Sequence, residues 1–192
     1  MSRLISGVGF NSVGKYKTHI NGIKTKSFIA WLNMIYRCYS KKTQERYPTY
    51  IGCSVADEWL DYQIFADWYE SQRHSSLDYD LDKDILVANN KIYSSETCCL
   101  VPHQLNQLLV DSGSIRGEYP QGVCLFKQNG KFVAKLRING KRQHLGYFDC
   151  PNEAYQAYKV AKEAHVKEKT LEWQDRIASD VFDALMRWSL DS

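Results

Sequence analysis

The chain has 192 residues, enough for one large or two small domains. Its composition, with 44% hydrophobic, 24% charged and 13% aromatic residues, predicts a packed core and excludes wholesale disorder. No apolar run approaches the roughly 20 residues of a membrane span, and the N-terminus lacks the apolar region of a secretory signal. We therefore expect a cytoplasmic protein with no membrane partner.

The hairpin and helices expected at the N-terminus form a first region, residues 1–75. Asn21-Gly22 is the commonest two-residue turn signal and predicts a β-hairpin. Apolar residues recur at helical spacing over residues 28–40 and again over residues 55–72. Ser54 is expected to cap the second of these helices, whose aromatic stripe would pack in the core.

The stretch "LDYDLDKDIL", residues 77–86, reads as a strand in which every second residue is an aspartate. Because successive side chains of a strand alternate between faces, four carboxylates would share one face: Asp78, Asp80, Asp82 and Asp84. We expect a polar loop over residues 87–96, a second short strand over residues 97–101 and a helix that begins near Pro102.

The second half of the chain begins with a linker rich in small residues, residues 111–122. Beyond it, Asn-Gly turns separate three expected strands: residues 122–127, 131–138 and 141–148. An amphipathic helix is expected over residues 152–169. A last helix over residues 171–190 would be either a strap onto the core or a dimer surface.

Charge and cysteine content bear on the partners of the chain. The net charge is only +3, but residues 116–150 hold seven Lys and Arg against two acids, which favours a polyanionic partner. The six cysteines include no C-x-x-C pair, and a cytoplasmic location disfavours disulfides. We expect free and mostly buried thiols.

The middle strand of the C-terminal sheet alternates in character. One face would carry apolar side chains that the helix can cover: Phe132, Ala134, Leu136 and Ile138. The other face would be open and cationic: Lys131, Val133, Lys135 and Arg137. Lysines and arginines that point one way suit phosphates, and arginine can also read guanine edges. The alternative is a merely solvated sheet face.

Residues 122–161, "GVCLFKQNGKFVAKLRINGKRQHLGYFDCPNEAYQAYKVA", resemble the plant ethylene-response-factor (APETALA-type) DNA-binding domain and its phage relatives. The landmarks are Gly122-Val123, the Gly130–Phe132 turn and Leu145-Gly146-x-Phe148. The resemblance implies three antiparallel strands that enter the major groove of double-stranded DNA. Carried over by position, the implied DNA contacts are Cys124, Phe126, Gln128, Lys131, Lys135, Arg137, Arg142 and His144.

The preceding segment, "LDKDILVANNKIYSSETCCLVPHQLNQLL", residues 81–109, resembles variant HNH (ββα-metal) endonucleases of phage genomes. "YSSETC" matches the Y-S-P-E-N-C turn of that family. The resemblance implies that Asp82 on the strand and Asn106 on the helix hold one Mg²⁺ or Mn²⁺ ion per site. It also implies that Asn90, or Asn89, braces the loop of the active site.

Lys83 takes the position of the usual general-base histidine in this resemblance. A lysine accepts a proton only where its surroundings strongly favour the neutral amine, so a phosphate-contacting or structural cation is an alternative role. Asp84 or Asp80 would then orient the water, or a histidine, His103 or His74, would approach from outside the strand.

The expected fold class is α+β, with four regions: an N-terminal hairpin and helical region (1–75), an HNH-like ββα-metal unit (76–112), an ethylene-response-factor-like sheet and helix (113–170) and a C-terminal amphipathic helix (171–192). The expected function is a phage HNH or homing-type DNA endonuclease that nicks DNA with a divalent metal, in the host cytoplasm if phage-encoded. The alternative is a catalytically inactive DNA-binding regulator with a degenerate HNH fold. An inhibitor that mimics DNA is disfavoured by the basic segment. The sequence leaves open whether the protein is a monomer or a dimer.

Overall fold

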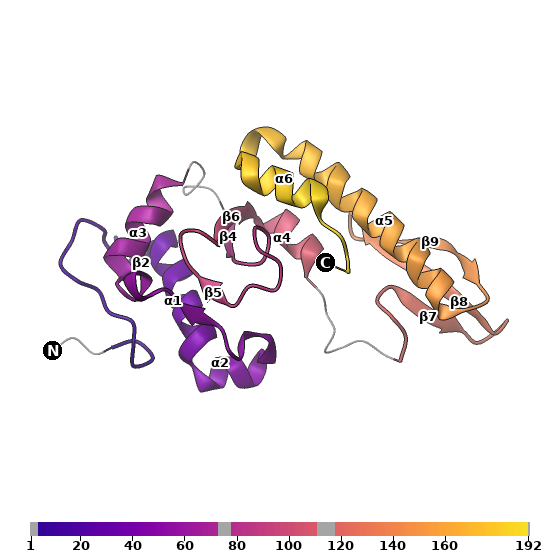
Figure 1. Cartoon of the computed structure of the whole chain (residues 1–192), viewed down its shortest axis with the longest axis horizontal. Helices are drawn as coiled ribbons and strands as arrows, with labels where there is room; N and C mark the ends of the chain where they lie inside the picture. The colour runs from indigo at the N-terminus through magenta and orange to yellow at the C-terminus, as the bar shows by residue number, and fades with distance from the viewer. Residues whose placement is uncertain (1–3, 73–77, 111–117, 192) are drawn as a thin grey trace. The chain divides into compact units, whose positions relative to one another are not determined.

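The computed structural model describes residues 4–72, 78–110 and 118–191, and its fold is mixed α+β, which confirms the expected class (Figure 1). The chain divides into two compact units. The first comprises Met1–His103 and Asp175–Val181, and the second comprises Gln104–Gln174 and Phe182–Ser192. Most of the expected linker, residues 111–117, lies outside the described residues.

The N-terminal elements of the first unit are a short hairpin and a set of helices. Asn21 and Gly22 both have positive φ and join the two strands of the hairpin, as the turn signal predicts. The side chain of Thr25 caps the first long helix by accepting the N–H of Phe28. The elements are β1 (His19–Ile20), β2 (Ile23–Lys24), α1 (Lys26–Tyr39), α2 (Lys41–Arg46) and the 3₁₀ turn η1 (Pro48–Tyr50).

The prediction of a single helix over residues 55–72, capped by Ser54, is wrong. Ser54–Val55 instead forms β3. The N–H of Ser54 donates to the carbonyl oxygen of Lys91, and the N–H of Ala56, which follows β3, donates to that of Tyr93. A 3₁₀ turn, η2 (Asp57–Leu60), follows, and α3 begins only at Tyr62 (Tyr62–Ser71). Asp61 separates the two and caps α3, since its Oδ1 accepts the N–H of Gln63 at 3.0 Å.

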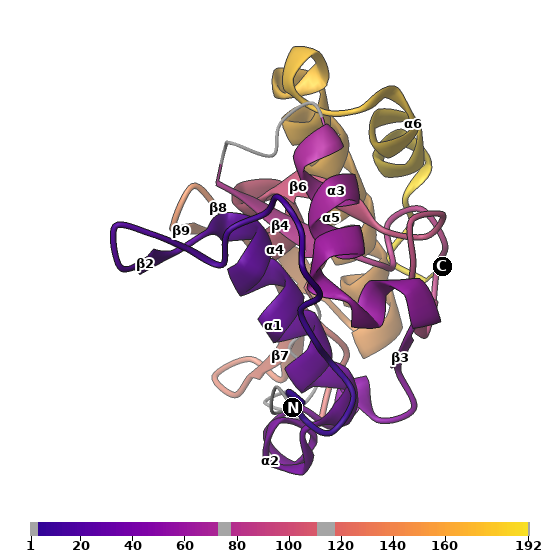
Figure 2. The same ribbon diagram turned by 90° about the vertical axis from the view of Figure 1, so that its left-hand side faces the viewer.

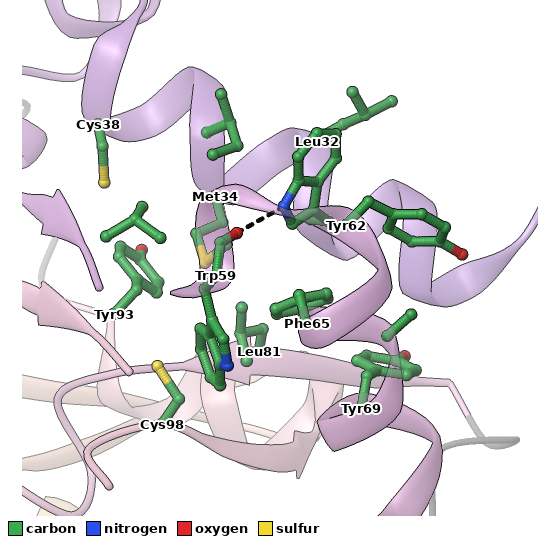
Figure 3. Packing of buried hydrophobic residues seen from close by; sticks show 14 of the residues in the cluster. Leu32, Met34, Cys38, Trp59, Tyr62, Phe65, Tyr69, Leu81, Tyr93 and Cys98 are labelled. Carbon is green, nitrogen blue, oxygen red and sulfur yellow. Dashed lines mark hydrogen bonds between the residues drawn. The ribbon is translucent and has the colours of Figure 1, made fainter. Parts of the chain in front are cut away.

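An aromatic core joins α1, η2 and α3 (Figure 3). Trp31 of α1 is fully buried and donates its indole N–H to the carbonyl oxygen of Trp59 at 2.8 Å, the dashed line of Figure 3. The ring of Trp59 meets that of Phe65 edge-on, with centroids 5.0 Å apart. Leu81 and Tyr93 join the same cluster, so this core packs against the acidic segment, residues 78–86.

The acidic segment is a shorter strand than residues 77–86 predict. β4 covers only Tyr79–Asp82 and pairs antiparallel with β6 (Cys99–Pro102), and α4 (His103–Leu109) follows directly. The expected polar loop contains a further strand, β5 (Ile92–Tyr93), which pairs in parallel with β3. The order strand, loop, strand, helix is therefore present.

In the second unit, three antiparallel strands pack on one long helix. Their order is β7–β8–β9, and their bounds agree closely with the expected strands: β7 (Val123–Phe126), β8 (Lys131–Ile138) and β9 (Lys141–Phe148). The helix α5 (Pro151–Glu172) covers one face, where Ala134 and Leu136 pack against Ala154 and Tyr158.

The last expected helix, residues 171–190, is interrupted in the structure. α5 runs to Glu172, a 3₁₀ turn η4 (Gln174–Arg176) follows, and α6 covers Ser179–Arg187. The tail then returns to α5: Ser189 and the N–H of Leu190 both donate to Glu163, and Leu190 packs against the core beneath α5. The tail therefore behaves as the expected strap.

The six cysteines are free thiols, and four of them are buried: Cys38, Cys53, Cys98 and Cys99. Within the described ranges, no helix has both the length and the apolar character needed to cross a membrane.

Candidate functional site

The strand pairing defines the open face of the sheet, which is the face opposite α5. Val133 of β8 lies between Cys124 of β7 and Tyr147 of β9, and Lys135 lies opposite His144. Members of such pairs point to the same side of a sheet. The open face consists of Cys124, Phe126, Lys131, Val133, Lys135, Arg137, Arg142, His144 and Tyr147.

This face gathers seven of the eight DNA contacts implied by the sequence resemblance. Gln128 is the exception, because it lies in the loop between β7 and β8 and is exposed there. The apolar side chains of β8 lie on the other face of the sheet and pack under α5. The alternation of apolar and cationic residues along β8 is therefore confirmed.

Tyr147 was missed by the sequence reasoning, and a β-bulge explains why. Ala134 pairs with Gly146 while Lys135 pairs with His144, so Leu145 is an extra residue in β9. Leu145 turns toward the α5 side, and Tyr147 returns to the open face. Gly146 permits the bulge, with φ of 145°, and an added Cβ would lie 3.1 Å from the ring of Phe148. The simple alternation of side chains along a strand does not reveal a register shift of this kind.

The open face is cationic and partly aromatic. Lys131 forms an exposed ion pair with Asp149 at 3.1 Å, which contributes little in water. Among the described residues, Lys135, Arg137 and Arg142 form no ion pair with a carboxylate. The ring of Tyr147 contacts those of Phe126 and His144, with centroids 5.5 and 4.6 Å apart.

Arg137 and Arg142 lie directly opposite each other in the β8–β9 pair. Like charges at opposed positions of a sheet destabilise it. Both side chains are exposed, so solvent weakens the repulsion but does not remove it. An anion bound between the two guanidinium groups would convert this repulsion into attraction.

Asp82 lies at the end of β4 in the first unit, opposite Cys99. Its Oδ1 accepts the backbone N–H groups of Asp84 and Ile85, at 2.7 and 2.8 Å, so the carboxylate fixes the turn that ends the strand. Burial raises the pKa of Asp82, the two backbone hydrogen bonds oppose that rise, and nearby Asp84 adds to it. The carboxylate is thus partly desolvated and lacks full compensation of its charge.

Lys83 is buried, and its ammonium is occupied by hydrogen bonds. Its Nζ donates to both carboxylate oxygens of Asp84 and to the carbonyl oxygen of Asn90, all at 2.7 Å. The ammonium also lies 5.9 Å from the ring centre of Tyr93. These contacts hold the cation in place and favour the structural role among the alternatives for Lys83.

Asn90 ties together the two ends of the loop that follows β4. Its Nδ2 donates to the carbonyl oxygens of Lys83 and Ile92, and its Oδ1 accepts the N–H of Ile92 at 3.0 Å. Asn89, the alternative brace, occupies the left-handed region with φ of 57°. Asn90 is therefore the residue that braces the loop, whatever the chemistry of the site.

Asp80 and His103 form a pair next to Asp82. The Nδ1 atom of His103 lies 2.9 Å from Oδ2 of Asp80, and both side chains are partly exposed. Asp80 and Asp82 are two residues apart on β4 and so point to the same face. Asp78 precedes the strand and Asp84 follows it, so the expected single face of four aspartates is wrong. His74 lies outside the described residues.

Asn106, the expected second ligand, lies on α4 in the second unit, whereas Asp82 lies in the first. The structure therefore does not test whether the two residues share a metal ion. Within the described part of the chain, no group of three or more His, Cys, Asp or Glu side chains is arranged to hold a metal.

Comparisons of the chain with models of protein families, with curated proteins and with solved structures found no significant match.

Proposed function

We propose that this protein binds double-stranded DNA through the open face of the β7–β8–β9 sheet. The observation that carries the proposal is the one-sided distribution of charge: the three strands contain no acidic residue, and four of their five Lys and Arg side chains, all but Lys141, lie opposite the face covered by α5. The major groove of DNA has phosphates along both rims and admits a β-ribbon.

Two kinds of contact support this proposal. Lys131 and Lys135 suit phosphate oxygens, which fix position without reading sequence. Arg137 and Arg142 form a pair of guanidinium groups whose mutual repulsion an anion would relieve, and each can also contact a guanine edge. Phe126 and the ring of Tyr147 offer apolar contact with thymine methyl groups.

Fluorescence anisotropy with a mixed-sequence duplex at low salt tests the proposal. Arg137→Ala is expected to weaken binding by about tenfold, the effect of losing one strong contact. Lys167→Ala is the matched control, because it also removes one positive charge from an exposed position, but on α5. Equal effects of the two substitutions would contradict binding through the sheet face.

Metal-dependent hydrolysis of the DNA backbone is a second candidate, and the observation that favours it is the pairing of Asp80 with His103 beside the partly buried Asp82. Asp82 fits a hard divalent cation, because its carboxylate is partly desolvated and a cation would offset the cost of its charge. Such ions commonly take only one or two carboxylates and fill the remaining positions with water and phosphate oxygens. When bound, the ion would neutralise charge on the scissile phosphate.

The residues of the chain would divide the other tasks of hydrolysis. His103 would accept a proton from the attacking water, and Asp80 would orient the imidazole through Nδ1. Lys83 and Asn90 would keep the loop after β4 in position through their mutual backbone contacts. This assignment replaces the base at position 83 with a histidine from the start of α4.

A plasmid-nicking assay tests the second candidate. Wild type with Mg²⁺ or Mn²⁺ should convert supercoiled plasmid to open circles, whereas Asp82→Ala and His103→Ala should not. Lys91→Ala, an exposed change in the same loop, should keep the activity. DNA binding that is insensitive to EDTA, with no cleavage in either metal, would instead support a DNA-binding regulator without catalysis.

A further inference from the structure

The β1–β2 hairpin of the first unit ends in a tip with two large apolar side chains in solvent. Ile20 and Ile23 pair directly across the turn and are 57% and 74% exposed. The turn itself is tight, with φ of 50° at Asn21 and 79° at Gly22, so the two side chains are held next to each other. Leaving both in water forgoes the gain that burial of an isoleucine normally brings.

The base of the hairpin is fixed to the core of its unit. The carbonyl oxygen of Lys17 accepts hydrogen bonds from Tyr62 of α3 and from Thr25, both at 3.1 Å. Tyr16 exchanges backbone hydrogen bonds with the side chain of Gln63, both at 3.0 Å. The tip is therefore presented by a rigid support, and Figure 2 shows the hairpin extending beyond α1.

The two faces of the hairpin differ. His19 and Lys24 form the other cross-strand pair, and the ring of His19 contacts that of Phe28 in α1, with centroids 5.7 Å apart. The face with His19 is thus turned toward the unit, and the isoleucine face is turned toward solvent.

Positive charge surrounds this apolar tip. Residues 14–26 contain four lysines and no acidic residue. Lys15 pairs with Asp67 of α3 at 3.0 Å, and Lys17 and Lys24 flank the tip in exposed positions. A protein partner could bury the two isoleucines but would also need acidic residues around them to pair with the lysines. A DNA duplex supplies both parts: phosphates for the lysines and stacked bases for the apolar side chains.

We propose that the β1–β2 hairpin is a second DNA-binding element, which inserts Ile20 and Ile23 as a wedge into a base step from the minor groove and bends the duplex. Apolar side chains form no hydrogen bonds with base edges, and isoleucine is among the side chains that proteins insert between base steps from the minor groove. Flanking cations hold the backbone on both sides of such a wedge and offset the cost of unstacking. This inference rests on the proposed DNA binding but assigns a separate surface and a separate effect.

The test uses the full chain and a duplex that carries a donor and an acceptor dye at its ends. Wild type is expected to raise the energy transfer by bending the duplex, and Ile20→Ala/Ile23→Ala to abolish that rise and weaken binding by about five- to tenfold. Ile51→Ala is the matched control, since Ile51 is 61% exposed in the same unit. All three proteins should melt at the same temperature, because these side chains lie outside the core.

A second readout addresses the groove. Replacing guanine by inosine removes the amino group from the minor groove and leaves the pattern of the major groove unchanged. Wild type should bind the inosine duplex more tightly than the guanine duplex, and the hairpin variant should not distinguish them.

The outcomes separate this inference from the proposed function. If Arg137→Ala weakens binding while the hairpin variant bends DNA as wild type does, the wedge is refuted and the sheet interface stands. If wild type binds no duplex at low salt, both fail. If wild type bends DNA and the double isoleucine variant binds without bending, the wedge is supported.

Discussion

Lys83→Met is the sharpest test of the role of the buried lysine. Methionine keeps most of the aliphatic stem but removes the ammonium, and with it three hydrogen bonds, two to Asp84 and one to the carbonyl oxygen of Asn90. An unpaired carbonyl oxygen costs about 1–2 kcal/mol. The ion pair adds about 1 kcal/mol at most, because half of the Asp84 side chain is exposed. The expected loss is therefore about 1–3 kcal/mol.

Thermal unfolding followed by circular dichroism measures this loss. For a chain of this size 1 kcal/mol corresponds to about 2–4 °C, so Lys83→Met should lower the Tm by about 2–12 °C. Lys91→Met, in which the exposed Lys91 loses only its contact with the carbonyl oxygen of Thr49, is the control and should change the Tm little. Asp84→Ala combined with Lys83→Met should cost no more than Lys83→Met alone, because the two residues act as one pair.

One result would refute the structural role of Lys83, namely a Tm of Lys83→Met equal to that of Lys91→Met. Equal melting would mean that the hydrogen bonds of the Lys83 ammonium do not stabilise the fold.

Three further predictions concern charge, metal and thiols. Arg137→Ala and Arg142→Ala should each reduce the slope of log K against log salt concentration by about 0.9, and an unchanged slope would remove that residue from the phosphate interface. Saturating Mn²⁺ should raise the Tm of wild type by about 5–10 °C, as expected at about one hundred times Kd, but should not raise that of Asp82→Ala; equal shifts would exclude Asp82 as a ligand. Burial raises the pKa of Cys98 to about 12, so its thiolate is scarce at pH 8 and becomes more abundant only as the pH approaches that value. A thiol reagent at pH 8 should therefore label exposed Cys124 quickly and Cys98 only after unfolding, and fast labelling of Cys98 in the folded protein would contradict its burial.

The sequence predicts the C-terminal sheet well because its signals are local. Asn139-Gly140 forms the tight turn between β8 and β9, and the alternation along β8 assigns each side chain to a face. The bulge at Leu145 escaped prediction, since it depends on the fit of β9 to β8 and to the core beneath α5. Tyr147 was missed for that reason alone.

The first unit was harder to predict because its decisive interactions are distant in sequence. Asp61 divides the expected helix by capping α3 and by accepting the N–H of Ser12 at 3.1 Å. β4 ends at Asp82 because that carboxylate captures two backbone N–H groups of the following turn. The composition around Lys83 showed that a histidine was absent, but only the structure shows that the ammonium is occupied by Asp84 and Asn90.

The parallel pairing of β3 with β5 has a consequence for cooperativity. Ser54 pairs with Ile92 and Val55 with Tyr93, so the loop that holds Lys83 and Asn90 is bonded to a strand from the N-terminal half. Closing so long a segment costs entropy that only the joint packing of both parts offsets. The acidic segment and the N-terminal helices therefore form one folding unit, in which the amides of Ser54 and Ala56 exchange with deuterium only when β3 detaches from β5. A fragment of residues 76–112 would lack β3. The loop that holds Lys83 and Asn90 would then lose the strand to which it is hydrogen-bonded.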